Sequence, residues 1–198
     1  MRIVLFAATA LAATALAGPA FAQDSDPSFT GAHAEGVVGW DRTQDGSDST
    51  DGIVFGGAAG YDIQVGKLVL GVEAEATTST NSQTVANVLT PGDSLRIGMG
   101  LDLYAGARVG FALSPSVMLY AKGGYSNASI DARYTSGATT AKDSDAAAGW
   151  RGGVGGEFKL GGRLYLKGEY RYAHYGEVYG NRIDRDRHQL VGGIGIRF

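Results

Sequence analysis

Apolar and polar side chains alternate along most of the chain with a period of two residues. From Leu101 to Leu113 every odd position is apolar, while the even positions include Asp102 and Arg108. A period of two is typical of a β-strand with one apolar and one polar face. We find eight such runs, over residues 30–41, 52–65, 67–77, 95–113, 116–127, 147–160, 163–173 and 187–198.

The connections between these runs alternate between short and long. Val65-Gly66-Lys67, Ser114-Pro115 and Gly161-Gly162 predict tight turns. Polar loops are predicted over residues 42–51, 78–94, 128–146 and 174–186. In an up-and-down sheet the tight turns then lie at one end and the long loops at the other, and an even strand number places both chain ends beside the tight turns.

Aromatic residues on the apolar face distinguish a soluble sandwich, which buries that face, from a membrane barrel, which turns it to lipid. They fall into two belts, towards opposite ends of the strands. One belt holds Trp40, Tyr125, Trp150, Tyr170 and Tyr172, and the other Tyr61, Phe111, Phe158 and Phe198. Belts about 25 Å apart match the two interfaces of an outer membrane. Phe29 departs from the parity and is expected to precede the first strand.

We therefore predict an all-β fold, an eight-stranded antiparallel transmembrane up-and-down β-barrel. The expected location is the bacterial outer membrane, with both termini periplasmic and the long loops extracellular. A soluble secreted barrel is the alternative, and it would partition away from membranes.

The polar face carries equal numbers of acidic and basic side chains, which suits a closed interior where charges are paired. The predicted charge network of the lumen comprises Glu35, Asp62, Glu73, Glu75, Asp102, Arg108, Lys122, Arg151, Glu157, Lys159, Lys167, Glu169, Arg171 and Arg197. Eight strands enclose an interior just filled by side chains, so a wide solute pore is not expected. A gate made of exchangeable pairs, involving Lys122 or Arg108, is the alternative.

Composition narrows the functional classes. The chain has 198 residues, 32 of them Gly, and no Cys. This length suits one domain, and the lack of Cys excludes disulfides, Cys-ligated metals and a catalytic thiol. With 17 basic against 20 acidic residues and no basic run, a nucleic-acid partner is not expected.

The first 22 residues form a separate segment. Arg2 is followed by an apolar stretch, and the stretch ends in Ala20-Phe21-Ala22. This order is typical of a secretory signal peptide. We predict cleavage between Ala22 and Gln23, which leaves residues 23–198 as the barrel domain.

Three histidines are the candidates for side-chain chemistry. By parity His33 faces the lumen as a paired interior side chain, and His188 lies on the lipid face at the rim. His174 opens the last long loop, where a histidine with a nearby serine would suggest lipid hydrolysis. Gly176 stands where a strand would place that serine, and residues 147–198 contain no serine. A lipid-modifying enzyme is therefore the weakest of the alternatives.

The first long loop is acidic, with Asp41, Asp45, Asp48 and Asp51. Carboxylates bind hard divalent cations, but this spacing is not that of a Ca²⁺-binding loop. We predict a solvated loop and no metal or cofactor site.

The C-terminal strand, residues 187–198, ends in Phe198 with apolar residues at alternate positions. It resembles the assembly signal of outer-membrane β-barrels, although Ile196 stands where the family often has an aromatic residue. Residues 119–127, 149–153 and 167–172 are similar to segments of the opacity-type, porin-like small barrels of proteobacteria.

This resemblance implies a monomeric barrel inserted by the barrel-assembly machinery with periplasmic chaperones, in contact with outer-membrane lipid and lipopolysaccharide. It also implies a structural or surface-interaction role without catalysis. The alternative function is a narrow gated channel for ions or small solutes.

Overall fold

A computed structural model of the chain describes residues 29–45, 48–88, 90–137, 139–178 and 181–198. The predicted signal peptide and its cleavage site lie outside the described residues. Among the residues that are described, no helix is both long and apolar enough to cross a membrane.

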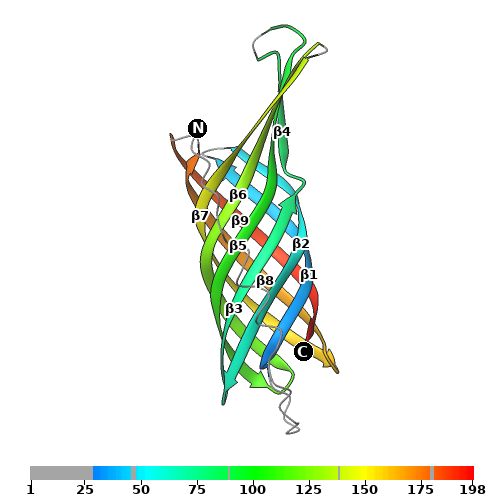
Figure 1. The fold of residues 1–198 in the computed structure, drawn as a ribbon, viewed down its shortest axis with the longest axis vertical. Helices are drawn as coiled ribbons and strands as arrows, with labels where there is room; N and C mark the ends of the chain where they lie inside the picture. Colours follow the sequence, from blue (N-terminus) through cyan, green and yellow to red (C-terminus); the bar gives the residue numbers. More distant parts are fainter. Residues whose placement is uncertain (1–28, 46–47, 89, 138, 179–180) are drawn as a thin grey trace.

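The described chain consists of antiparallel strands (Figure 1). They are β1 (Gly31–Asp45), β2 (Asp48–Val65), β3 (Leu68–Ser79), β4 (Ser82–Ala86), β5 (Ser94–Ser114), β6 (Val117–Ser136), β7 (Thr139–Gly161), β8 (Leu164–Val178) and β9 (Asn181–Arg197). The short β4 pairs only with β5, so the other eight strands form the barrel wall. The predicted eight-stranded up-and-down barrel is confirmed, with β4 as an added hairpin arm.

Two pairings close the ring. β3 pairs with β5, from Leu68 opposite Phe111 to Thr78 opposite Leu101. The first and last strands pair from His33 opposite Arg197 to Asp45 opposite Arg185. A closed ring leaves no bare strand edge in a medium that offers no hydrogen bonds.

The two ends of the barrel differ. Turns of two residues join β2 to β3, β5 to β6 and β7 to β8, as predicted. At the other end β5, β6 and β7 continue beyond the ring as a narrow twisted sheet with β4 (Figure 1). The prediction of long loops was wrong in this respect, because most of residues 42–51, 128–146 and 174–186 are paired strand.

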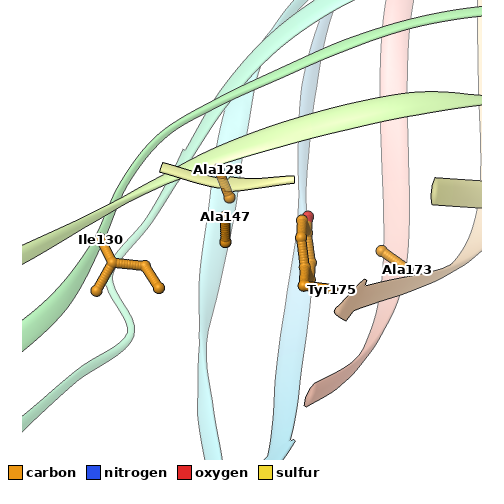
Figure 2. Packing of buried hydrophobic residues seen from close by; sticks show 5 residues of the cluster. All are labelled: Ala128, Ile130, Ala147, Ala173 and Tyr175. Carbon is orange, nitrogen blue, oxygen red and sulfur yellow. The ribbon is translucent and has the colours of Figure 1, made fainter. Parts of the chain in front are cut away.

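The barrel is inverted relative to a soluble domain, because its apolar face points outward. Val38 is 58% exposed and Leu190 62%, whereas Arg171 is fully buried inside. Buried apolar residues form only small clusters, such as the one near the extended end made of Ala128, Ile130, Ala147, Ala173 and Tyr175 (Figure 2).

Candidate functional site: the ion-paired barrel interior

The period-two pattern determines which side chains enter the lumen. Of the predicted network, every member except Lys159 is buried inside the ring. Lys159 is only half-buried, and its Nζ lies 4.3 Å from the centre of the Phe29 ring. Phe29 itself precedes β1 as expected, and it is buried against this end of the lumen.

At the end with the tight turns, two arginines share a pair of carboxylates. Arg197 bonds Asp62 at 2.6 Å and Glu157 at 2.7 Å. Arg108 approaches Asp62 from the other side, with its Nε 2.7 Å from Oδ1. These contacts connect four strands, β2, β5, β7 and β9, across the interior.

In the middle layer Lys122 lies between three carboxylates. Its Nζ is 2.7 Å from Glu73, 2.8 Å from Glu169 and 3.7 Å from Glu75. The Tyr120 hydroxyl donates to Glu169 at 2.5 Å. The layer continues in ion pairs between Lys167 and Glu35 and between Arg171 and both Glu75 and Glu169.

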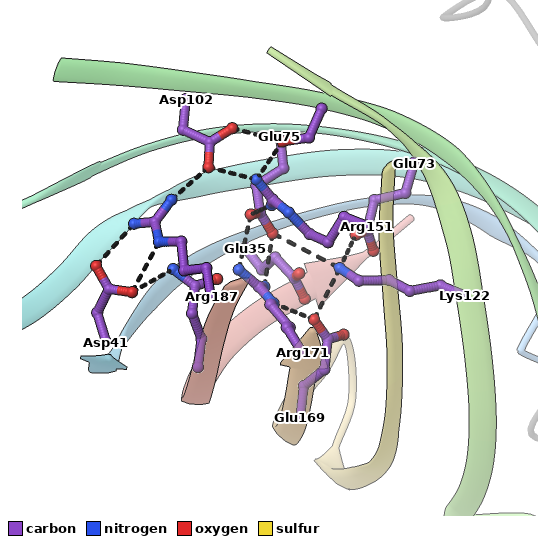
Figure 3. Close-up of polar contacts among 12 residues, drawn as sticks. Glu35, Asp41, Glu73, Glu75, Asp102, Lys122, Arg151, Glu169, Arg171 and Arg187 are labelled. Atoms are coloured by element: carbon purple, nitrogen blue, oxygen red, sulfur yellow. Dashed lines mark hydrogen bonds and ion pairs between the residues drawn. The ribbon is translucent and has the colours of Figure 1, made fainter. Parts of the chain in front are cut away.

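The layer nearest the extended end centres on Asp102, which accepts from two arginines (Figure 3). Arg151 reaches Asp102 at 2.6 Å and Glu75 at 2.8 Å. Arg187 reaches Asp102 at 2.7 Å and holds Asp41 with its Nε and Nη2, at 2.7 and 2.8 Å. The planar guanidinium suits such paired contacts, which explains why arginine predominates in this layer.

Charge is nearly balanced across the described interior. The buried acids are Glu35, Asp41, Asp62, Glu73, Glu75, Asp102, Glu157 and Glu169, and the buried bases are Arg108, Lys122, Arg151, Lys167, Arg171, Arg187 and Arg197. His33 lies among them, 3.5 Å from Asp62 and 4.0 Å from Glu73. Its predicted place in the interior is confirmed, but among the described residues neither ring nitrogen has a hydrogen-bond partner.

The sequence analysis missed two members of this network, Asp41 and Arg187. Asp41 was assigned to the first loop, although it continues the odd-numbered inward face of its strand. Arg187 is the first inward position of the predicted last strand. Both are end residues of predicted strand runs, 30–41 and 187–198, so applying the parity to those end residues would have found both. The lumen tyrosines Tyr120 and Tyr165, which donate to Glu169 and Glu35, were missed as hydrogen-bond donors.

The predicted solvated acidic loop is wrong for Asp41, whose carboxylate is buried, whereas Asp51 is exposed as expected. Asp41 points inward to Arg187, and Asp51 lies on the outer face in a two-bond contact with Arg42. The hydrogen bonds from Arg42 hold the pKa of Asp51 below its usual value. The side chains of Asp45 and Asp48 lie outside the described residues. Within the described chain, no three His, Asp or Glu side chains are grouped to hold a metal ion.

The other two histidines lie on the outer face. His174 belongs to β8, not to a loop, and its Nδ1 is 3.0 Å from Asp186. His188 contacts Tyr170 at 2.7 Å through Nδ1 and packs 5.2 Å from the Tyr172 ring. The predicted rim packing of His188 is confirmed.

The aromatic residues of both predicted belts face outward. Trp40, Tyr61, Phe111, Tyr125, Trp150, Phe158, Tyr170 and Phe198 are exposed. Tyr172 is half-buried because it packs 5.3 Å from Trp150. A groove of about 520 Å³ also lies on this outer apolar face, lined by Gly36, Val38, Phe55 and neighbouring residues.

A filled, charged lumen within an apolar exterior is the arrangement of a membrane barrel. The family described as "Outer membrane protein beta-barrel domain" matches residues 8–198. The chain belongs to this outer-membrane β-barrel family. The predicted resemblance to small outer-membrane barrels is thereby confirmed, and the protein is an outer-membrane barrel of Gram-negative type.

Relatives of this outer-membrane barrel include the 25 kDa outer-membrane immunogenic protein of Brucella ovis. It is 31% identical over 163 residues, which span 81% of this chain and 72% of the relative. The same-named protein of Brucella abortus is 30% identical over 169 residues, covering 81% of this chain and 74% of its own.

Solved structures show the same fold. Neisserial surface protein A superposes with a TM-score of 0.58 at 17% identity, covering 85% of this chain and 98% of its own. The attachment invasion locus protein Ail of Yersinia pestis, solved with the heparin analogue sucrose octasulfate, gives 0.51 at 12% identity, covering 85% and 99%. At these identities the likeness concerns the fold alone.

Proposed function

We propose that this outer-membrane barrel is a closed anchor with a structural and surface-contact role, which presents its extended end outside the cell. In this proposal it performs no catalysis and carries no continuous flow of solute. The observation that carries the proposal is the sheet of β4, β5, β6 and β7, which projects well beyond the ring.

The ion-paired interior supports the anchor role. Side chains from strands on opposite sides of the ring meet in the lumen, as Arg151 of β7 does with Glu75 of β3. Separating such buried pairs costs several kcal/mol, so they resist opening. The network stiffens the wall while the outer surface is left to lipid and partners.

The proposed orientation places the chain ends and tight turns in the periplasm. The projecting sheet and the other hairpins then lie outside, next to lipopolysaccharide. The name of the Brucella relatives, an immunogenic outer-membrane protein, agrees with surface exposure. Insertion as a monomer by the barrel-assembly machinery and periplasmic chaperones belongs to the same proposal.

Single-cysteine labelling tests this orientation. The chain has no Cys, so an introduced cysteine is the only thiol that the reagent can label. Ser136→Cys places a thiol at the tip of the β6–β7 hairpin, and Lys67→Cys places one in the β2–β3 turn. On intact cells a membrane-impermeant maleimide is expected to label only Ser136→Cys, and lysis should expose Lys67→Cys. Labelling of Lys67→Cys alone on intact cells would reverse the orientation.

A narrow gated channel is the second candidate, and the position of Lys122 favours it. Three carboxylates within 3.7 Å offer this cation alternative partners, so the pairs could rearrange to open a path. Lys122→Gln and Arg108→Gln would then change single-channel conductance, whereas a closed anchor shows no current in any of these forms.

A further inference from the structure

His33 is the histidine that lies inside the ring, in a row of residues that crosses three strands. In β1 it is directly opposite Gly60 of β2, and Gly60 is directly opposite Glu73 of β3. The imidazole lies over Gly60, because a Cβ atom on that glycine would be 2.6 Å from Cε1 and 2.7 Å from Nε2 of the ring. The glycine therefore leaves the space through which the ring reaches towards the third strand.

Both ring nitrogens of His33 face carboxylates. Nδ1 is 3.5 Å from Asp62 Oδ2 and Nε2 is 4.0 Å from Glu73 Oε2, and all three side chains are buried. Among the described residues, neither nitrogen has a hydrogen-bond partner, and Glu73 Oε2 has none either. A neutral imidazole has one N–H group, so the lone pair of its other nitrogen would face a carboxylate oxygen. An imidazolium turns an N–H group towards each carboxylate, and adjustments of roughly 1 Å would make both hydrogen bonds.

The other charged groups around this row come from the remaining strands of the wall. Arg108 of β5 and Arg197 of β9 bond Asp62, and Lys122 of β6 bonds Glu73. These cations oppose a further positive charge on the ring, whereas the two carboxylates favour it. The titratable side chains next to these groups are Glu35 of β1, Glu157 of β7, and Tyr165 and Lys167 of β8.

The total charge of the lumen favours a charged ring. The buried side chains named above comprise eight acids but seven lysines and arginines, and Lys159 at the edge is only half-buried. A buried charge without a counter-charge is costly. One proton on His33 would make this buried set neutral, at a place where two carboxylates already face the nitrogens.

We propose that His33 is a proton-binding site of the lumen, and that its imidazolium fastens β1 to β2 and β3 through Asp62 and Glu73. When the proton leaves, a bare nitrogen faces a carboxylate and the link across Gly60 is lost. The site lies inside the ring, so it does not depend on which end faces the outside of the cell. It adds a response to pH to the proposed anchor.

The first test leaves every lumen side chain unchanged. His174→Gln/His188→Gln replaces the two outer-face histidines, so that His33 is the sole histidine of the full barrel. In phosphatidylcholine nanodiscs at about pH 7, nitrogen NMR of the isotopically labelled ring is expected to show two N–H nitrogens. A ring with one protonated and one bare nitrogen at that pH would overturn the proposal.

The second test compares two carboxylates of β3 in the same single-histidine barrel. Glu73→Gln removes the charge that faces Nε2, whereas Glu75→Gln removes one that bonds Arg151 and Arg171. Either variant leaves Lys122 an ion pair with Glu169. Glu73→Gln should lower the midpoint of the His33 titration by about one pH unit, which is a tenfold loss of proton affinity. Glu75→Gln is the matched control and should shift the midpoint by less than roughly half as much. Equal shifts would contradict the assigned contact.

The third test measures urea unfolding in lipid vesicles at about pH 6 and about pH 8.5. Because the folded barrel holds this proton more tightly than the unfolded chain in the proposal, unfolding releases it, and stability must fall as the pH rises. The unfolding equilibrium constant of the single-histidine barrel should rise by about tenfold between the two conditions. With His33→Gln added, that rise should disappear. An equal rise with and without His33 would show that the proton binds elsewhere and overturn the site.

Discussion

Replacing Arg151 with methionine is expected to reveal how much the interior network stabilises the barrel. Arg151 is buried, and it bonds Asp102 at 2.6 Å, Glu75 at 2.8 Å and the Ser126 hydroxyl at 2.8 Å. Breaking a buried ion pair by removing one partner costs about 3–5 kcal/mol. Glu75 and Asp102 each keep another arginine, so we expect a loss of about 3 kcal/mol, at the lower end of that range.

The assay is reversible urea unfolding in lipid vesicles, followed by tryptophan fluorescence. Arg151→Lys keeps the charge but not the planar fork, so it should lose roughly half as much stability. Arg151→Met/Glu75→Gln removes both members of one pair and should be more stable than the sum of the two single losses predicts. If Arg151→Met unfolds within about 0.5 kcal/mol of the parent, the network does not hold the barrel together.

Two further predictions concern a glycine and a tyrosine. A methyl group on Gly195 would overlap the buried Tyr165 ring, so Gly195→Ala should lower the free energy of unfolding by about 1–3 kcal/mol in the same urea assay. Gly168→Ala is the control and should be nearly neutral, because a methyl group on Gly168 meets nothing within 4 Å. The hydrogen bond that Tyr134 donates to Asp93 raises the pKa of Tyr134 above its usual value. That bond is complete below pH about 10 and is lost as the pH rises through the raised pKa. The difference between the ultraviolet pH titrations of the parent and of Tyr134→Phe isolates the ionisation of Tyr134. We expect this phenol to ionise at a higher pH than an ordinary tyrosine, and ionisation at the ordinary pH would contradict the contact.

The barrel wall was predictable because a single physical rule acts along its whole height. Wherever one face meets lipid and the other the lumen, side chains alternate, as in residues 101–113. That alternation predicted all eight wall strands and the direction of nearly every charged side chain. It also predicted the tight turns, because Gly66, Pro115 and Gly162 occupy positions where the chain must reverse.

The extended hairpins were not predictable in the same way. Beyond the belt the contrast reverses instead of continuing. In β6 the inward positions from Ala128 to Tyr134 are apolar or aromatic and the outward positions from Asn127 to Thr135 are polar, so the run with an apolar outer face ends there and the segment was assigned to a loop. Asp41 was missed although the predicted strand run, residues 30–41, includes it, because its charge was grouped with the acidic residues of the loop that follows. The short β4 has too few residues for a periodic signal.

The pairing of charges in the lumen could not be derived from one chain. Parity states that Glu75 and Arg151 both point inward, but it does not state that they meet. Their contact depends on strand register and on the closure of β3 against β5, which the alternation alone does not determine.

The most direct test of the account is the conductance of the purified, refolded barrel in a planar lipid bilayer. Trp40 and Trp150 fluorescence would confirm insertion, since both rings face the bilayer in the described structure. The account predicts a silent membrane over a wide range of voltage, because paired charges fill the interior. Stable, discrete current steps from the inserted parent protein would contradict it and identify the barrel as a pore.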